Sequence, residues 1–158
     1  LYGEPYINGW KSRLAAYPPA LAQVMVKKYL TFFPIWGLEP HFRTRDATVW
    51  RYQVLVEAAQ NIVGILAGLN GLYFTTFQFK RMRRFLDQMT IAPVDLAARL
   101  EQLFQLDQPA ALTELETLVA ETIILVETYM PTVDTTKAKR RLGWRQSEWQ
   151  PVVSMQHR

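Results

Sequence analysis

The fold is decided by the stretch Tyr52-Gln-Val-Leu-Val-Glu-Ala-Ala-Gln-Asn-Ile-Val-Gly-Ile-Leu-Ala-Gly-Leu69. Its apolar residues recur every three or four positions along one face, and the opposite face also carries Val54, Ala58 and Ile65. A helix that is apolar on nearly all sides belongs in the interior of a protein. The segment therefore predicts a central helix around which the rest of the chain packs.

A membrane span is the alternative reading of this region. The 22 residues between Glu57 and Lys80 carry no charge, which is long enough to cross a bilayer. Several polar side chains dilute the run, however, and Gly68 and Gly71 interrupt it. We therefore expect a soluble core helix and no membrane association.

Apolar residues at helical spacing, with prolines at the boundaries, predict further helices on both sides. One should begin at Pro18 or Pro19, with its buried stripe formed by Leu21, Val24, Met25, Tyr29 and Phe32. Others are expected over residues 75–89, from Pro93 through Phe104, and over residues 109–130. The fold class is therefore all-α: an up-and-down bundle of about five helices with a short extended N-terminal connector.

Three side-chain placements follow from these helices. Phe104 should face inward at the end of the fourth helix, and Tyr129 should face inward on the fifth. Asp95 and Arg99 are four residues apart, a spacing that favours an ion pair on one helix face.

The length of 158 residues suits a single domain. Residues 1–17 are expected to connect to a missing N-terminal domain, because the chain starts at Leu1 and opens with no signal-peptide pattern. Residues 18–131 form the helical bundle in this reading. Residues 132–158 are a polar, basic tail that either packs across the bundle through its two Trp or is partly disordered.

Composition removes several classes of chemistry. Cysteine is absent, which agrees with a cytoplasmic protein and leaves no thiolate nucleophile or Cys-based metal site. His41 and His157 are the only histidines and lack ligand-like spacing, so no metal site is expected. None of the common nucleotide-loop, zinc-protease or hydrolase motifs occurs. The net charge of +4 is too small to indicate a nucleic-acid-binding protein by itself.

Arg45 and Asp46 lie just ahead of the central helix, beside Arg43. In one interpretation Asp46 or Thr48 caps the helix and the arginines are solvated. In the other, Arg43 and Arg45 form a phosphate site at the helix N-terminus.

Asn70, Tyr73 and Lys80 follow the same helix. Asn70-Gly71 is a common C-terminal stop, in which case Tyr73 is a core aromatic residue and Lys80 a surface residue. Alternatively Tyr73 contacts a ligand and Lys80 supplies a positive charge. Glu57 could be a carboxylate with a raised pKa suited to base catalysis, or a partner of Arg51 or Arg45.

Two basic clusters occur, at residues 80–84 and 137–141. They could contact nucleic acid or an acidic protein surface, but no aromatic residues interleave with them in a stacking pattern. A solvated helix face and a loose basic tail are the simpler explanations.

The order Tyr17-Pro18, Arg45-Asp46, Leu69-Asn-Gly-Leu-Tyr-Phe74, Lys80 and Ala92-Pro93 resembles a helical domain of unknown function. That domain follows a polymerase-β-like nucleotidyltransferase domain in bacterial proteins, whose layout is similar to that of the aminoglycoside (kanamycin) nucleotidyltransferases. The resemblance covers roughly residues 2–130. The catalytic half of such proteins carries a Gly-Ser motif, and this chain contains no Gly-Ser dipeptide.

The resemblance implies an accessory, substrate-binding role for a fragment that is not catalytic alone. Its implied cleft residues are Arg45, Asp46, Asn70, Tyr73 and Lys80, with Glu57 as a weaker catalytic candidate. It implies no cofactor in this domain, with Mg²⁺ and a nucleoside triphosphate bound by the missing domain. The implied partners are that N-terminal nucleotidyltransferase domain and a small-molecule acceptor.

Two other functions stay open. One is a helical protein-interaction module of the antitoxin type. The other is a basic nucleic-acid-binding domain, which the weak charge signal makes the lesser alternative.

Overall fold

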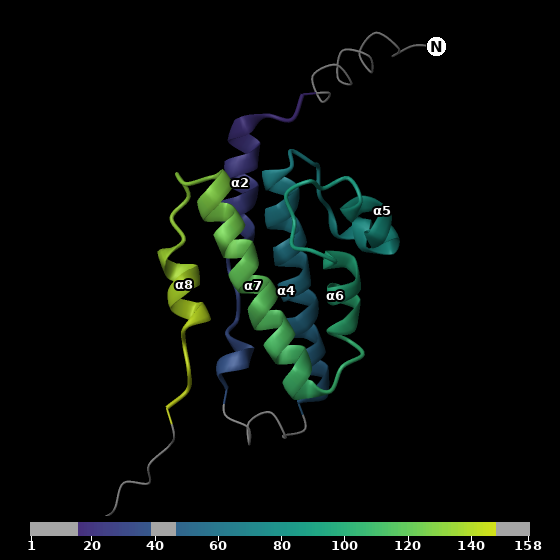
Figure 1. Cartoon of the computed structure of the whole chain (residues 1–158), viewed down its shortest axis with the longest axis vertical. Helices are drawn as coiled ribbons and strands as arrows, with labels where there is room; N and C mark the ends of the chain where they lie inside the picture. Colours follow the sequence, from purple (N-terminus) through teal and green to yellow (C-terminus); the bar gives the residue numbers. More distant parts are fainter. Residues whose placement is uncertain (1–15, 39–46, 148–158) are drawn as a thin grey trace, which may run out of the picture.

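The computed structural model describes residues 16–38 and 47–147, and throughout these residues the regular structure is helical (Figure 1). The elements in chain order are α2 (Pro19–Tyr29), η1 (Ile35–Gly37), α4 (Thr48–Leu69), η2 (Thr76–Arg81), α5 (Met82–Leu86), α6 (Leu96–Gln102), α7 (Gln108–Tyr129) and α8 (Thr136–Leu142). The helices α2, α4, α6, α7 and α8 alternate in direction along the long axis. The all-α, up-and-down bundle expected from the sequence is therefore confirmed.

Helix α4 is the centre of the bundle and packs against both α2 and α7. Every residue from 61 to 68 is buried, so the second half of the helix is enclosed on all sides as its pattern predicts. The first half differs, because Tyr52 and Val56 are 41% and 43% exposed. Here the apolar stripe faces outward along part of its length.

Helix α4 ends in a Schellman motif. Gly71 has φ of +64°, the left-handed conformation that glycine adopts without strain. The amide of Leu72 donates to the carbonyl of Ala67, and the amide of Gly71 donates to that of Gly68. The expected Asn-Gly stop is thus confirmed.

Helix α2 begins at Pro19, where a missing N–H costs no helical hydrogen bond. It packs closely on α4, because a Cβ added at Gly64 would lie 2.4 Å from the Tyr29 ring. The expected buried stripe is wrong at one position: Val24 is 59% exposed, whereas Val26 is fully buried. The helix is rotated relative to the sequence-based assignment, so that its contact face includes Val26.

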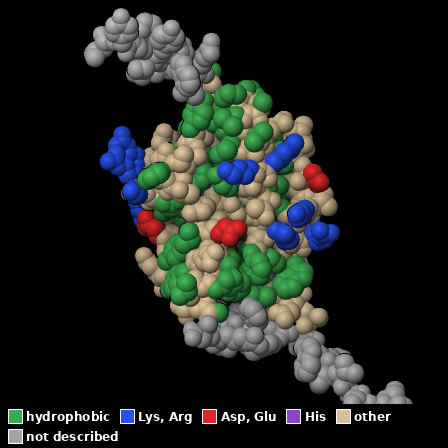
Figure 2. Space-filling model, turned by 180° about the vertical axis from the view of Figure 1, so that it is seen from behind, with side chains coloured by type: hydrophobic (Ala, Val, Ile, Leu, Met, Phe, Trp, Pro, Cys, Tyr) green, Lys and Arg blue, Asp and Glu red, His purple; other side chains and the backbone are tan. Residues whose placement is uncertain are grey.

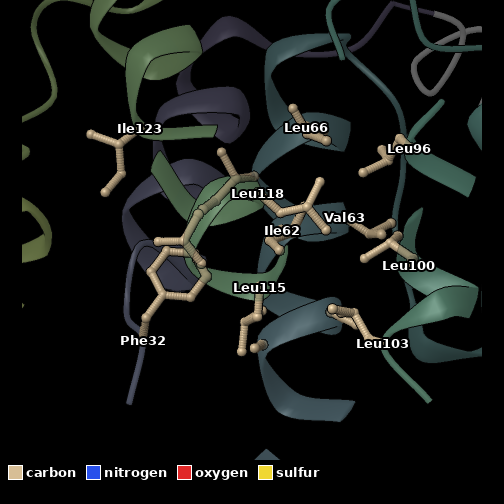
Figure 3. Close-up of a cluster of buried hydrophobic side chains, with 14 of the residues drawn as sticks. Phe32, Ile62, Val63, Leu66, Leu96, Leu100, Leu103, Leu115, Leu118 and Ile123 are labelled. Atoms are coloured by element: carbon tan, nitrogen blue, oxygen red, sulfur yellow. The ribbon is translucent and has the colours of Figure 1, made fainter. Parts of the chain in front are cut away.

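Helix α7 starts at an N-cap, where the carboxylate of Asp107 accepts from the amide of Ala110 at 2.9 Å. Its buried face meets α4, and the buried leucines of α6 join the same core (Figure 3). The core joins side chains of three helices and the segment after α2: Phe32, Ile62, Val63, Leu66, Leu96, Leu100, Leu103, Leu115, Leu118 and Ile123. The expectation for Tyr129 is wrong, because it is 56% exposed at the end of the helix.

The helix expected over residues 75–89 is broken into the 3₁₀ turn η2 and the short helix α5. Buried Phe74 explains the break, since its ring contacts Phe79 edge-on at 6.1 Å and Phe85 at 6.0 Å. The chain must turn around Phe74 to bring both rings against it.

The following helix, α6, runs from Leu96 to Gln102. Leu96, Leu100 and Leu103 are buried as expected, but Phe104 is 38% exposed and the expectation that it faces inward is wrong.

The part of the 132–158 tail that the structure describes is packed rather than loose. Helix α8 contacts α7, and the Trp36 indole N–H donates to the carbonyl of Leu142 at 3.1 Å. The residues that follow α8 pack closely against η1 at Gly37, because a Cβ at this position would lie 2.2 Å from the carbonyl oxygen of Trp144. Trp149, the second Trp of this expectation, and the N-terminal connector over residues 1–15 lie outside the described residues.

Candidate functional site

A groove of about 510 Å³ lies between α4, the η2–α5 segment and α6. We call it the basic groove. Its floor is apolar and consists of Val56, Ala59, Phe79, Met82, Leu100 and Phe104. Its rim is charged and consists of Lys80, Arg81, Arg83, Arg84 and Glu101. An apolar floor with a few convergent polar groups is typical of a ligand site.

The charges on this rim do not cancel. Arg83 forms a two-pronged hydrogen bond with Glu101, with Nε at 2.9 Å from Oε1, and this pairing raises the pKa of the Arg83 guanidinium. It also ties α5 to α6. Arg81 and Arg84 form no ion pair with another described residue, and Lys80 Nζ lies 5.0 Å from the centre of the Phe77 ring. The rim therefore keeps a net positive charge after Arg83 and Glu101 have paired.

Figure 2 shows basic side chains standing out at the left edge of the molecule, the side on which α5 lies in this view. Apolar side chains cover much of the lower half of the same face. Tyr52 and Phe104 contribute to the exposed apolar surface beside the groove, and their rings stack at 6.3 Å with 12° between their planes. The groove thus combines exposed aromatic rings with unpaired cations.

A second pocket of about 390 Å³, here called the tyrosine pocket, lies next to the end of α4. It is lined by Tyr17, Gly71, Leu72, Tyr73, Gln78, Phe85 and Gln88 and shares none of these residues with the basic groove. No charged side chain lines it. The rings of Tyr17 and Tyr73 contact each other at 4.9 Å, inclined by 59°.

The hydroxyl of Tyr17 is buried and has no hydrogen-bond partner. Burial, followed by the proximity of Tyr73, raises the pKa of Tyr17. A buried hydroxyl without a partner costs about 1–3 kcal/mol relative to one that is satisfied. The group therefore has an unused capacity to donate and accept.

Asn70, one of the site residues expected from the sequence, has its amide fully occupied within the fold. Its Nδ2 donates to the carbonyls of Leu66 at 2.7 Å and Ile91 at 2.8 Å. Its Oδ1 accepts from the amides of Thr90 at 2.8 Å and Ile91 at 2.9 Å. In this arrangement Asn70 fastens the end of α4 to the loop before α6.

Tyr73 and Lys80 do not come together. Tyr73 lines the tyrosine pocket and Lys80 the basic groove, so these two implied cleft residues line different concave surfaces. A ligand-binding role for either residue stays a prediction. Arg45 and Asp46 lie outside the described residues.

Glu57 lies on the exposed face of α4. Its carboxylate is therefore open to solvent rather than enclosed by apolar side chains. The proposed pairing with Arg51 is absent too, because Arg51 Nη1 donates to Oε1 of Gln108. No group of three acidic, His or Cys side chains suited to a metal occurs within residues 16–38 and 47–147.

The sequence did not identify four contributors to these two sites, namely Arg81, Arg84, Phe104 and Tyr17. Arg81 and Arg84 were treated as part of a solvated face, and Phe104 as a core residue. The basic run at 80–84 was the available signal, but the apolar floor beneath it comes from α4 and α6, far away in sequence. Tyr17 gave no signal of its own.

The α4 helix is long and apolar enough to cross a membrane, but 67% of its most apolar 18-residue stretch is buried inside the bundle. That burial is typical of a core helix in a soluble protein. No protein-family model, curated protein or solved structure matches the chain. The resemblance to a nucleotidyltransferase-associated domain therefore rests on the quoted residues.

Proposed function

We propose that this chain is an accessory substrate-binding helical domain of a bacterial, cytoplasmic, nucleotidyltransferase-like protein, not catalytic on its own. Its binding surface in this proposal is the basic groove, where a phosphate-bearing ligand such as a nucleotide is held. The observation that carries the proposal is the apolar floor beneath a rim with unpaired Arg81 and Arg84. Mg²⁺ and catalytic groups would come from the N-terminal nucleotidyltransferase domain of the same protein.

The groove suits both halves of a nucleotide. Guanidinium groups bind phosphate oxygens through paired, charge-assisted hydrogen bonds, and Arg81 and Arg84 are available for such bonds. A lysine acts as a point charge, the role expected for Lys80. The ring of Phe104 is partly exposed and offers an aromatic surface for a base.

The proposal is tested by titrating ATP into the nitrogen-15-labelled chain and following its amide resonances. We expect shifts clustered in residues 79–84 and 100–104. Replacing Arg81 and Arg84 together by Gln should weaken binding by at least about tenfold, because each removes a charge-assisted hydrogen bond.

The matched control replaces Lys137 and Arg140 by Gln, removing the same charge from α8. This variant should bind ATP like the unaltered chain. Equal weakening by both double variants would reduce the effect to general charge attraction, and an absence of shifts in 79–84 would rule out the groove as the nucleotide site.

A protein-interaction module is the second candidate, because exposed apolar side chains continue from the groove along α4. Val49, Tyr52 and Val56 are 83%, 41% and 43% exposed. Silence towards ATP together with capture of the N-terminal domain on this stripe would favour that function. A steep loss of RNA or DNA binding with added salt would instead favour a basic nucleic-acid-binding domain.

A further inference from the structure

The tyrosine pocket has a chemistry opposite to that of the basic groove. It has a volume of about 390 Å³ and no charged lining residue. An anion would find no cation in it and a cation no carboxylate, so the desolvation of either would be uncompensated. The pocket therefore selects for an uncharged ligand.

Its polar groups are neutral and partly unused. Tyr73 is 43% exposed, and neither its hydroxyl nor the side-chain amide of Gln78 forms a hydrogen bond within the described part of the chain. Gln88 donates through Nε2 to the carbonyl of Arg84, which leaves its Oε1 as an acceptor. Amide and hydroxyl groups of this kind recognise carboxamide and hydroxyl groups of a ligand.

Tyr17 adds the observation that points most directly to a ligand. Its hydroxyl is closed to water and unpartnered, although the pocket lies beside it. A turn of the Tyr17 ring into the pocket gives up no hydrogen bond, since the hydroxyl has none to lose. The ordinary pKa of a tyrosine, about 10, already keeps the hydroxyl protonated at neutral pH and able to donate, and burial raises the pKa of Tyr17 further.

We propose that the tyrosine pocket binds an uncharged, planar ring that bears a carboxamide or hydroxyl group. The Tyr73 ring contacts the ligand ring, and the Tyr17 hydroxyl turns to donate to the ligand's oxygen. This site is separate from the basic groove and does not depend on a nucleotide being the ligand there.

The charge preference is tested with three probes of nearly identical shape: neutral benzamide, anionic benzoate and cationic benzamidine. Each is titrated into the nitrogen-15-labelled 158-residue chain at neutral pH. Benzamide should shift the amides of residues 71–73, 78 and 88, and the two charged probes should bind at least about tenfold more weakly. Equal binding of the three probes, or no shift in these amides with benzamide, overturns the proposal.

The role of Tyr17 is tested with Tyr17→Phe, which removes only the hydroxyl. Because that hydroxyl is unsatisfied in the free protein, the variant should be at least as resistant to urea as the unaltered chain. It should nevertheless bind benzamide about 3- to 10-fold more weakly. A merely structural tyrosine would show the reverse: lower resistance to urea and unchanged binding.

Tyr129→Phe serves as the matched control, because Tyr129 is exposed on α7 outside both sites. It should change neither urea resistance nor benzamide binding. The double variant at Arg81 and Arg84 should also bind benzamide normally, which separates this proposal from the nucleotide-binding one. Loss of benzamide binding in either control would contradict a site at the tyrosine pocket.

Discussion

The side chain of Asn70 supplies hydrogen-bond partners to backbone groups at the end of α4 and in the loop at residues 90–91. Its four short contacts with Leu66, Thr90 and Ile91 use both ends of the amide. Asn70→Ala should lower the free energy of unfolding by about 2–4 kcal/mol, because it leaves the part-buried carbonyl and amide of Ile91 without partners. Urea unfolding measures this loss.

Asn61 provides the comparison. It is also on α4 and more deeply buried, but its side chain makes one hydrogen bond, from Nδ2 to the carbonyl of Thr31 at 2.6 Å. Asn61→Ala should therefore cost less, about 1–2 kcal/mol. If Asn70→Ala kept full stability but bound ligand more weakly, Asn70 would be a binding residue rather than a structural one.

The sequence predicts part of this arrangement. Asn-Gly after an apolar helix indicates a stop, and Gly71 adopts the left-handed conformation that such a stop uses. The other partners of Asn70 lie 20 and 21 residues further along the chain. Their proximity depends on how η2 and α5 fold back, which helical periodicity does not report.

At the scale of elements, α8 is held to α7 by an exposed carboxylate. Glu127 accepts from the Thr135 hydroxyl at 2.6 Å and from Lys139 at 3.0 Å. The bond from Thr135, and then that from Lys139, lowers the pKa of Glu127. A lowered pKa means that the folded protein binds this proton less readily than the unfolded chain.

Stability should therefore fall with acidification at this position. The contribution of Glu127 is complete above the ordinary carboxyl pKa of 4.5, and it disappears as the pH falls through the lower value of the folded state. Urea unfolding of the unaltered chain and of Glu127→Gln should differ at neutral pH and converge in acid. The difference should shrink with added salt, since Glu127 is exposed.

Asp134 makes this comparison necessary, because its pKa is also lowered, by the Thr136 hydroxyl and amide. Its effect is present in both proteins and cancels in the difference. A gap between the two proteins that stays constant from neutral pH to acid would show that the charge of Glu127 does not hold α8.

The long helices were predictable, but of the short helices only α6 was expected from the sequence. Helices α2, α4 and α7 carry apolar repeats over several turns between prolines or caps, so their existence follows from the sequence. Helices α5 and α8 span 5 and 7 residues, too few for periodicity to show. Their positions are set by tertiary contacts such as Phe74 with Phe85 and Trp36 with Leu142.

Arg99 shows the same limit for charge pairing. Its spacing predicted a pair with Asp95, but its guanidinium bonds to Glu114 and Glu121 on α7. Asp95 instead precedes α6 in a left-handed conformation, with φ of 54°. The spacing indicated that Arg99 forms an ion pair. It did not indicate that the partners lie on α7.

At the scale of the whole molecule, the turn around Phe74 explains why the expected site is divided. Tyr73 and Lys80 lie on either side of the segment that wraps this ring, and they line different pockets. Two concave surfaces of opposite chemistry result, one positive and one uncharged. The sequence supplied the charges of the first, but the apolar floor required the packing of α4, α5 and α6.

The packing of the bundle determines at which positions α4 tolerates a charged side chain. Ile65 is fully buried among the other helices, whereas Val56 is 43% exposed. Val56→Lys should lower the free energy of unfolding by less than about 1 kcal/mol, because the ammonium group reaches water. Ile65→Lys should cost more than about 4 kcal/mol or prevent folding, since it buries an unpaired charge.

A membrane-spanning α4 would behave differently, because lipid surrounds such a helix on all sides. Lysine at either position near its middle would then cost about 2.5–3.5 kcal/mol of insertion. Urea unfolding and the soluble yield of the two variants distinguish the cases. A large asymmetry, with Val56→Lys soluble and folded, fits a helix that is apolar because protein encloses its second half, while equal damage from both substitutions would contradict the bundle.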